Sequence, residues 1–439
     1  MPASPSLLIV PARFKTGKLY TQIATTSAGV VLASSGDFNV TRATTATRFN
    51  SAGLIESVAS GVPRLDYYTS GGTAGCPALL VEPSAANGIL NSQDTATSWL
   101  IGANLTSGYT DVIGVSGNNL TVAVSGSNIG AALGRMQRIS NNVALASGST
   151  YTISFLMRQT GTHTIGGYYA VITGGAAGDL GGGFSVSGSF SSGSTYNSAG
   201  TTNRIRRVEQ WGTDVYRCSE TFTMTASGTL TAFNLAPLSG VSSASNPAVG
   251  LGIAFAAPQI ELGALPTSFI PTTTGSVTRN ADVVTLSGAV SGCIGQTEGT
   301  IYAEVDLRAS ASSSARRIVN MRVDGSNLLS LEIPTAGTSV DFSAVSGGSS
   351  VTATASGITT GIYKIAVGYN SAASGTVLYV NGTLRDTKTI AIPNLSAAVL
   401  GLGVRGDGGA GTQFNDRIRA VAIYTTRLTN AELATLTTL

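Results

Sequence analysis

The sequence predicts an all-β protein: an extended N-terminal module, then two antiparallel jelly-roll β-sandwiches, and one short C-terminal helix. Glycine supplies 55 of the 439 residues, and only 11% are charged, against about 25% in a typical globular protein. Hydrophobic residues reach 42%, which excludes a disordered chain. Short alternating apolar runs recur between Gly, Ser, Thr and Asn clusters, the pattern of many short strands joined by turns.

Residues 1–90 are rich in arginine, proline and turn residues and show little periodicity. Such a segment buries little surface alone, so we expect it to lie extended across another domain or another copy of the chain. Its first stretch, SLLIVPARFKTGKLY, is apolar and flanked by prolines, which favour extended backbone. This arm either docks onto a partner or a sister subunit, or forms the first strand of its own domain.

Residues 91–276 have the strand spacing of a β-sandwich. The predicted strands are 151–159, 167–173, 215–224 and 251–262. The low-complexity stretch 187–203 is predicted to be a long exposed loop.

Residues 277–439 repeat this pattern as a separate sandwich. Predicted strands are 299–309, 316–323 and 363–370, and Asn381-Gly382 is a strong hairpin signal within 376–387. Near the C-terminus, Thr429 and Glu432 have the spacing of a capping box, which predicts a short helix.

The composition also excludes several function classes. Lys and Arg total 25 against 22 Asp and Glu, and no basic run exceeds a pair, so no nucleic-acid interface is expected. One histidine and three scattered cysteines cannot build an ordinary zinc site, and the scarcity of histidine removes most acid–base and Ser-His-Asp chemistry. No stretch approaches the roughly 18 apolar residues of a membrane span, and the start lacks a signal-peptide pattern. We therefore expect synthesis in the cytoplasm and no membrane insertion.

Three segments resemble a known family. The sequence TRATTATRFNSAGLIESVASGVPRLDY (41–67), followed by CPALLVEP (76–83), resembles the opening module of tail-fibre and head-fibre proteins of tailed bacteriophages. Residues 257–286 resemble the junction that ends the following sandwich in those proteins, a sandwich similar to carbohydrate-binding modules. Residues 277–439 resemble a concanavalin A-like (laminin G-like) jelly roll.

The resemblance implies a non-enzymatic structural protein of the virion, a fibre or spike subunit on head or tail, made in the host cytoplasm. It implies a homotrimer that contacts other virion proteins through its N-terminal arm. The alternative is a receptor-binding protein that recognises a host cell-surface glycan, and a polysaccharide depolymerase or a surface adhesin is further removed. Many weak contacts made by several copies would act through avidity.

Aromatic side chains in the middle sandwich are the candidates for stacking on sugars. These are Trp99, Tyr109, Tyr168, Tyr169 and Trp211. The alternative is core or edge packing, because large aromatic rings in a chain with few aromatics are mostly buried.

A glycine-rich loop supplies the calcium candidates Asp407, Asn415 and Asp416. Turn formation alone also explains Asp and Asn there. No other cofactor is expected.

A strand carries the candidate catalytic pattern Glu304, Asp306 and Arg308 on one face. It resembles the Glu-x-Asp-x-Glu strand of concanavalin A-like glycosidases, but arginine replaces the last glutamate and cannot supply the acid–base proton. We therefore expect a salt-bridged strand face and no enzyme activity.

Charged residues of the N-terminal module are the candidates for oligomer or virion contacts, because the planar guanidinium suits interface carboxylates. They are Arg42, Arg48 and Arg64, with Glu56 and Asp66 as partners across subunits.

Overall fold

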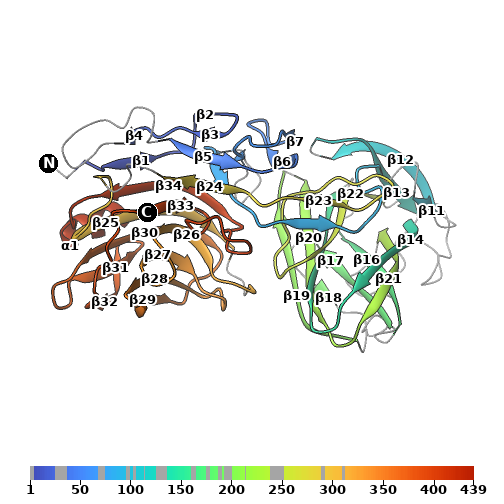
Figure 1. The fold of residues 1–439 in the computed structure, drawn as a ribbon. Helices are drawn as coiled ribbons and strands as arrows, with labels where there is room; N and C mark the ends of the chain where they lie inside the picture. The colour runs from blue at the N-terminus through green and yellow to red at the C-terminus, as the bar shows by residue number, and fades with distance from the viewer. Residues whose placement is uncertain are drawn as a thin grey trace.

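The structure is a computed structural model, and it describes residues 4–24, 37–67, 75–94, 99–101, 105–112, 114–124, 136–159, 165–174, 178–185, 190–191, 200–212, 214–237, 252–287, 292–308 and 312–439. Within these ranges the chain forms antiparallel sheets and one short helix, so the predicted all-β class is confirmed. Two sandwiches lie side by side, the C-terminal one in orange and red and the middle one mostly in green (Figure 1).

The first sheet of the C-terminal sandwich gathers strands from both ends of the chain. In spatial order it contains β32 (Thr383–Lys388), β31 (Thr376–Val380), β30 (Gly361–Asn370), β25 (Glu298–Leu307), β34 (Arg417–Tyr424), β1 (Leu7–Ile9) and β4 (Ile23–Ala24). Strand β9 (Ala78–Leu80) also pairs with β34, and β8 (Leu65–Asp66) pairs with β9.

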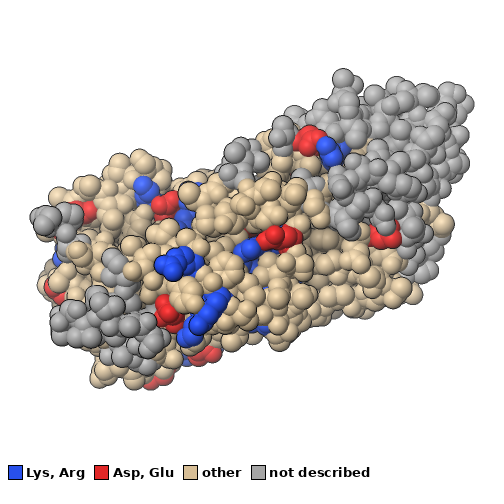
Figure 2. All heavy atoms as spheres, turned by 90° about the horizontal axis from the view of Figure 1, so that it is seen from above, with Lys and Arg blue, Asp and Glu red and all other residues tan. Residues whose placement is uncertain are grey.

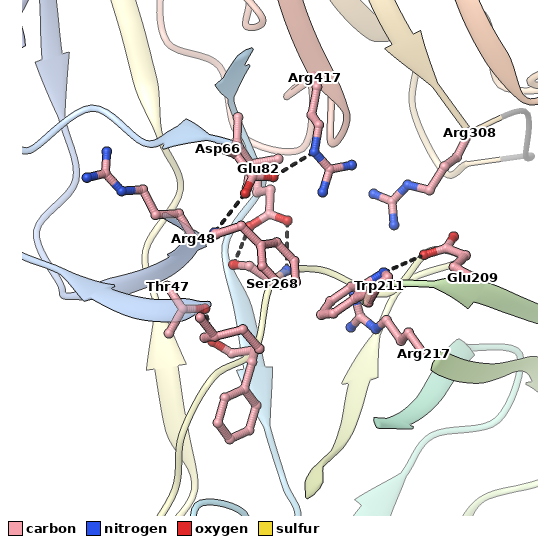
Figure 3. A pocket seen from close by; sticks show the side chains of 14 residues that line it. Thr47, Arg48, Asp66, Glu82, Glu209, Trp211, Arg217, Ser268, Arg308 and Arg417 are labelled. Atoms are coloured by element: carbon pink, nitrogen blue, oxygen red, sulfur yellow. Dashed lines mark hydrogen bonds and ion pairs between the residues drawn. The ribbon is translucent and has the colours of Figure 1, made fainter. Parts of the chain in front are cut away.

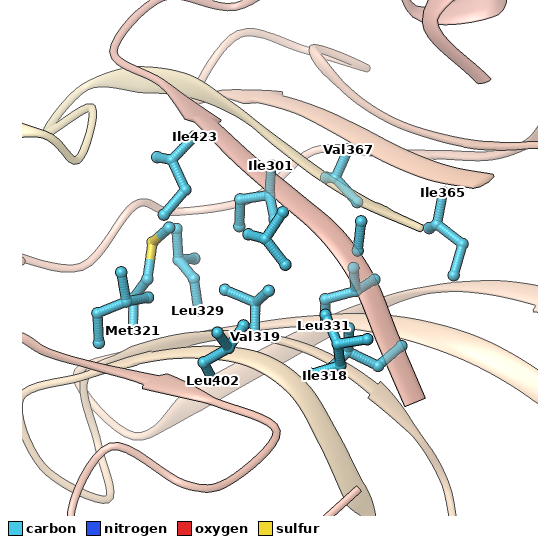
Figure 4. Packing of buried hydrophobic residues seen from close by; sticks show 14 of the residues in the cluster. Ile301, Ile318, Val319, Met321, Leu329, Leu331, Ile365, Val367, Leu402 and Ile423 are labelled. Carbon is cyan, nitrogen blue, oxygen red and sulfur yellow. The ribbon is translucent and has the colours of Figure 1, made fainter. Parts of the chain in front are cut away.

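The second sheet of this sandwich faces the first. Its order is β2 (Phe14–Lys15), β3 (Lys18–Leu19), β5 (Phe38–Thr41), β24 (Val283–Leu286), β33 (Val399–Leu402), β26 (Arg316–Arg322), β27 (Leu328–Ile333), β28 (Ser339–Ser346) and β29 (Ser349–Ser356). Inward aliphatic side chains of both sheets fill the space between them, as Figure 4 shows for Ile301, Val319 and Leu402. Their alternation with polar residues along each strand is what a half-buried strand requires.

Among the described residues of the first 90, strands β1 to β5, β8 and β9 belong to the two sheets of the C-terminal sandwich. Leu7 lies opposite Ile423 in the register of β1 and β34, and both Leu7 and Ile9 are fully buried. In Figure 1 the blue N-terminal strands run along the top of the C-terminal sandwich. The apolar arm is therefore a strand of its own chain, the second of the two possibilities that its sequence left open.

The middle sandwich follows the predicted strands 151–159, 167–173, 215–224 and 251–262 closely. One sheet has the order β11 (Leu100–Ile101), β14 (Met136–Leu145), β21 (Gly228–Pro237), β16 (Ile165–Gly174), β17 (Gly178–Ser185) and β18 (Phe190–Ser191). The other has the order β12 (Leu105–Val112), β13 (Val115–Val124), β22 (Gly252–Leu262), β15 (Thr150–Gln159), β20 (Val215–Met224) and β19 (Thr201–Gln210). The predicted loop at 187–203 lies mostly outside the described residues, and its described parts belong to β18 and β19.

Aromatic rings from both sheets form the core of the middle sandwich. Phe155 contacts Tyr168, Phe184 and Phe255 with ring centroids 5.6–6.1 Å apart. Edge-to-face pairs of this kind add to the stabilisation from burial itself.

Two short strand pairs lie where the sandwiches meet. The hairpin of β6 (Ala46–Phe49) and β7 (Ile55–Val58) is one, and β10 (Ala85–Asn87) with β23 (Val277–Arg279) is the other. Phe49 from this region packs edge-on against Trp211 of the middle sandwich, with ring centroids 4.8 Å apart. The two sandwiches therefore share an apolar contact as well as the chain connections.

Local sequence signals for the hairpin and the helix are confirmed. Asn381 and Gly382 join β31 to β32 and both have positive φ, 49° and 78°, as a two-residue type I′ turn requires. Helix α1 (Asn430–Thr437) begins after Thr429, whose side chain accepts a hydrogen bond from the Glu432 amide in a complete capping box. Leu433 of α1 packs on the outer face of the first sheet.

The surface carries few charges. On the face shown in Figure 2, Lys, Arg, Asp and Glu appear as small separate groups of both signs. Among the described residues, no helix is both long and apolar enough to cross a membrane.

We expect Leu7→Ala to lower the free energy of unfolding by about 2–5 kcal/mol, although Leu7 lies near the chain terminus, because it empties part of the C-terminal core. Urea unfolding of the full chain measures this. Val10→Ala is the matched control. Because Val10 is exposed, this substitution should change the free energy of unfolding by no more than about 0.5 kcal/mol. Equal, small effects of the two substitutions would show that β1 does not contribute to the core in solution.

Candidate functional site

The most unusual site in the described chain is a buried group of charged side chains between the sandwiches. We call Arg42, Arg64, Glu82, Arg279 and Asp282 the ionic hub. All five are nearly inaccessible to solvent, with Arg64 0% and Glu82 2% exposed. They come from four segments: after β5, before β8, after β9, and from the end of β23 to the residue before β24. The hub therefore joins the N-terminal segments to the segment that contains β23 and β24.

The two carboxylates of the hub bridge its three arginines. Arg64 Nη1 donates to Glu82 Oε2 at 2.6 Å and its other terminal nitrogen pairs with Asp282. Arg42 Nη1 lies 2.9 Å from Asp282 Oδ1, and Arg279 pairs with Glu82. The Glu82 amide also donates to Asp282 Oδ2 at 2.9 Å. The surplus positive charge is met by main-chain oxygens, which accept the remaining hydrogen bonds of Arg42.

Residues 263–270, which follow β22 as the chain leaves the middle sandwich, are hydrogen-bonded to the same hub. The Ser268 amide donates to Glu82 Oε1 and its hydroxyl to Glu82 Oε2, both at 2.7 Å. Thr47 Oγ1 donates to Phe269 O at 2.6 Å. Arg217 of β20 donates to Thr267 O at 2.5 Å and stacks over the Trp211 ring, 4.7 Å from its centroid. These contacts extend the hub into the middle sandwich.

Burial and neighbouring charges shift the pKa values of the buried charged groups in opposite directions. Burial alone would raise the pKa of Glu82, but Arg64 and Arg279 outweigh it and hold that pKa well below its usual range. Burial lowers the pKa of Arg217 to about 10, only partly offset by Glu261 and Glu209. Glu82 of the hub and Arg217 beside it therefore both remain charged at neutral pH.

A small cavity adjoins the hub, and Figure 3 shows charged side chains from three parts of the chain around it. Arg417 Nε lies 2.6 Å from Asp66 Oδ2, while Arg308 and Glu209 face the cavity from the two sandwiches. Its volume of about 30 Å³ is room for a water molecule or two and too little for a sugar ring. This junction is a packed structural contact.

The charged residues predicted to pair across subunits have their partners within one chain. Arg42 and Arg64 belong to the hub, and Asp66 pairs with Arg417. Arg48 and Glu56 lie opposite each other in the β6–β7 hairpin, 2.8 Å apart. The structure thus corrects this expectation: a buried charge needs its partner on folding, and here the same chain supplies it.

Three of the aromatic candidates for sugar stacking are buried. Trp99 packs edge-on against Phe233, and Tyr168 lies in the aromatic core of the middle sandwich. Trp211 is covered by Phe49 and Arg217 as described above. These three rings offer no open face to a ligand. Tyr169 is half-buried in β16, and the Tyr109 side chain lies outside the described part of the structure.

The three calcium candidates do not form one ligand set. Both oxygens of Asp416 are taken by arginines, with Arg308 Nε and Arg316 Nη1 each at 2.7 Å. Asp407 pairs instead with Arg405 at 2.6 Å in an exposed turn, while Asn415 is buried. Within the described ranges, His, Cys, Asp and Glu form no cluster of three or more that could hold a metal ion.

The strand with the candidate catalytic pattern has a salt-bridged face, but the partners of Glu304 and Arg308 come from other segments and not from within the pattern. Val305 and Leu307 point into the core, so Glu304 and Asp306 share the opposite face of β25, and Arg308 follows directly after the end of the strand. Glu304 pairs with Arg419 at 2.8 Å, and Arg308 pairs with Asp416 from the loop before β34. Burial raises the pKa of Asp306, partly offset by Arg417.

Sequence reasoning missed the hub residues Glu82, Arg279 and Asp282. The available signal was the rarity of charge: all three are charged residues in a chain in which only 11% of residues are charged.

We expect Glu82→Gln to lower the free energy of unfolding by about 3–5 kcal/mol, because it leaves Arg64 and Arg279 buried without their carboxylate. Glu56→Gln makes the same change in the half-buried Arg48 pair, which water still reaches, and should cost about 1 kcal/mol. Urea unfolding of both variants tests this. A Glu82 variant as stable as the Glu56 variant would mean that the hub is not ionic.

Acid should weaken the fold through the same carboxylate. Because the pKa of Glu82 is depressed in the folded chain, its contribution is complete above its unfolded value of about 4.3 and is lost as the pH falls below it. We expect the free energy of unfolding to fall between about pH 5 and pH 3, with a shallower fall in Glu82→Gln. An unchanged pH slope in the variant would contradict this assignment.

Comparison with known proteins supports the fold of the C-terminal sandwich. Residues 278–434 match the family model of the concanavalin A-like lectin/glucanases superfamily. The comparison with curated proteins found no match.

Solved structures with some likeness to the chain include the carbohydrate-binding module of an intramolecular trans-sialidase from Ruminococcus gnavus. It is 19% identical, with a TM-score of 0.29 over 33% of this chain and 85% of that one. Domain 4 of an arabinanase from Geobacillus stearothermophilus is 14% identical, with a TM-score of 0.31 over 39% and 82%. We draw no functional argument from these low scores. The C-terminal part of this chain, residues 278–434, is a concanavalin A-like β-sandwich domain.

Proposed function

We propose that this chain is a non-enzymatic structural subunit of a tailed-phage particle, a fibre or spike displayed on its head or tail. The observation that carries the proposal is the position of the hub. Its five residues all fall within 41–67, 76–83 and 257–286, the segments that resemble phage fibre proteins. The resemblance thus rests on residues with a definite physical task, which is to join two sandwiches through one buried contact.

A rigid connection suits a displayed protein. Interfaces between domains of one chain are usually polar enough to allow relative motion. Here buried ion pairs and the Phe49–Trp211 contact lie together at the junction, so bending it would expose unpaired charge. Two sandwiches held in this way project from a particle in a fixed orientation.

The side chains of β25 support a non-catalytic role. A retaining glycosidase needs two carboxyl groups about 5–5.5 Å apart in complementary protonation states. On this strand Glu304 is paired with Arg419, and arginine stands at position 308. The best candidate for a paired carboxylate site is therefore broken at Arg308.

In this proposal the partners are two further copies of the chain and other virion proteins. The N-terminal strand is already used within the chain, so these contacts fall to other surfaces. Weak contacts repeated in several copies would then act together through avidity.

A second candidate function is recognition of a host cell-surface glycan. The observation that favours it is the match of residues 278–434 to a superfamily described by lectins and glucanases. This function is compatible with display on the particle and is tested separately below.

Antibodies raised against the purified chain are expected to label intact particles produced from the genome that encodes it, and the free protein should have a mass of about three times 44.2 kDa. Immunogold electron microscopy and light scattering measure the two properties. Protein found in the lysate but absent from purified particles would overturn the proposal.

Saturating host cells with the purified trimer separates the two candidates. If the chain is structural only, phage adsorption is unchanged, whereas a receptor-binding subunit lowers it in proportion to the protein bound. A folded monomer serves as the control for avidity.

A further inference from the structure

The net positive charge of the chain is concentrated in its first segment. Residues 1–36 contain Arg13, Lys15 and Lys18 and no acidic residue. Because these are three of the 25 Lys and Arg, the rest of the chain carries 22 residues of each sign and is neutral. An uneven charge distribution of this kind favours association with a partner of opposite charge.

Strands β2 and β3 place the two lysines directly opposite each other on one outward face. In their register Phe14 lies opposite Leu19, and Lys15 lies opposite Lys18. Leu19 is fully buried and Phe14 packs against the hydrophobic core, so the two lysines point away from the core. Like charges directly opposite each other destabilise an antiparallel pair. The hairpin therefore keeps a local repulsion that its fold does not need.

Arg13 and Tyr20 flank the two strands and continue the same face. The Tyr20 amide donates to Arg13 O at 3.0 Å, and strand alternation puts Arg13 on the side of Lys15 and Tyr20 on the side of Lys18. Lys15 Nζ lies 6.0 Å from the centroid of the Tyr20 ring. We call these four residues the basic face. Its strands lie at the top of the C-terminal sandwich in Figure 1, and Figure 2 views the molecule from that side.

The cations of the basic face lack a carboxylate partner in the described part of the chain. Within it none of the three forms an ion pair, whereas the three arginines of the ionic hub are all paired. The first acidic residue along the sequence, Asp37, accepts a hydrogen bond from the Thr21 amide at 3.1 Å. Arg13 and Lys15 are exposed and Lys18 is half-buried. The basic face therefore presents its charges to solvent.

Main-chain hydrogen bonds hold the turn of this hairpin in place. Gly17 of the turn has a φ of 78°, a conformation that glycine adopts readily. Its amide donates to Gly61 O, and its carbonyl accepts from the Val40 amide, both at 2.9 Å. The basic face is therefore pre-organised, so a partner that binds it has little backbone to order.

The small size of the basic face indicates the class of partner. Segments that bind membranes through charge have about four to eight clustered cations, and single-stranded nucleic acid is bound along grooves that follow about 4–16 nucleotides. Three cations on two strands about 5 Å apart form a smaller group. A second copy of this chain is a poor partner, because its charges balance outside this segment. A compact group of carboxylates on another protein fits the basic face.

We propose that the basic face docks onto an acidic surface of another protein, whose carboxylates pair with Arg13, Lys15 and Lys18. Such carboxylates would also offset the repulsion between the two lysines. Arg and Tyr are both enriched in protein interfaces, and Tyr20 gives the contact an apolar surface beside the charges. The inference goes beyond the proposed function, because it holds for the isolated chain. Its test needs no particle, so its failure would leave display on a particle standing.

The test uses the purified full-length chain and a fluorescent peptide of alternating Asp and Glu, with a Ser-Gly peptide of equal length as the neutral probe. Fluorescence anisotropy should show binding of the acidic peptide alone. Lys15→Gln/Lys18→Gln should weaken this binding about fivefold or more at low salt. The affinity of the unchanged chain should fall as salt is added, because exposed charges are screened.

Lys364→Gln/Lys388→Gln is the matched control. These are the other two lysines of the chain, so both double variants have the same net charge. Lys364 donates to Thr438 O at 2.9 Å and Lys388 pairs with Asp386 at 3.2 Å, and this variant should bind the peptide like the unchanged chain. Lys15→Gln/Lys18→Gln should also have a raised melting temperature, because it removes the repulsion between facing lysines.

Several results would overturn the proposal. Equal loss of affinity in the two double variants would mean that net charge alone attracts the peptide. Unchanged affinity in Lys15→Gln/Lys18→Gln, combined with aggregation of that variant, would mean that the lysines only guard the edge strand β2 against pairing with other chains.

Two further probes test the class of partner. They are a short oligothymidylate and vesicles of equimolar phosphatidylcholine and phosphatidylglycerol. Weaker binding of both than of the acidic peptide would support a protein partner. If either probe binds more tightly than the peptide, and Lys15→Gln/Lys18→Gln removes that binding, the basic face serves a nucleic acid or a membrane and the proposal is wrong.

Discussion

The buried pairing of Arg64 with Glu82 and Asp282 is the interaction on which the rest of this structure depends. A desolvated charge without its partner is strongly unfavourable, so the segments that carry these residues dock together or not at all. Because Ser268 joins the same carboxylate, the linker from the middle sandwich follows. The relative position of the two sandwiches is then set by hydrogen-bond geometry as well as by apolar contact.

Local chemistry made much of the fold predictable. Alternation of apolar side chains located β15, β20 and β30, and the Asn381-Gly382 turn and the Thr429 cap depend only on neighbouring residues. The position of β1 was not predictable in this way. Its partner β34 is set by contacts across almost the whole chain, as the Ser6–Ile423 hydrogen bond shows, and no local pattern encodes such a pairing.

The candidate sites show the same difference between local signals and contacts that join distant segments. The fit of guanidinium groups to carboxylates predicted pairs for Arg42, Arg64 and Asp66 across subunits, and the structure gives all three their partners within one chain. What the sequence could not supply was the identity of those partners, because ion pairs between distant segments leave no spacing signature. Aromatic residues such as Tyr168 suggested stacking on sugars, but strand alternation alone does not tell which face of a sandwich is the inner one.

The pairing of β1 with β34 also has a consequence for the order in which the chain acquires its structure during synthesis. Ser6 and Ile423 are 417 positions apart, so the first strand waits for nearly the whole polypeptide to leave the ribosome. Contacts of such high sequence separation slow folding, and domains tend to complete in the order of their synthesis. The middle sandwich can therefore finish first, and closure of the C-terminal sandwich around the N-terminal strand is the last event of biogenesis.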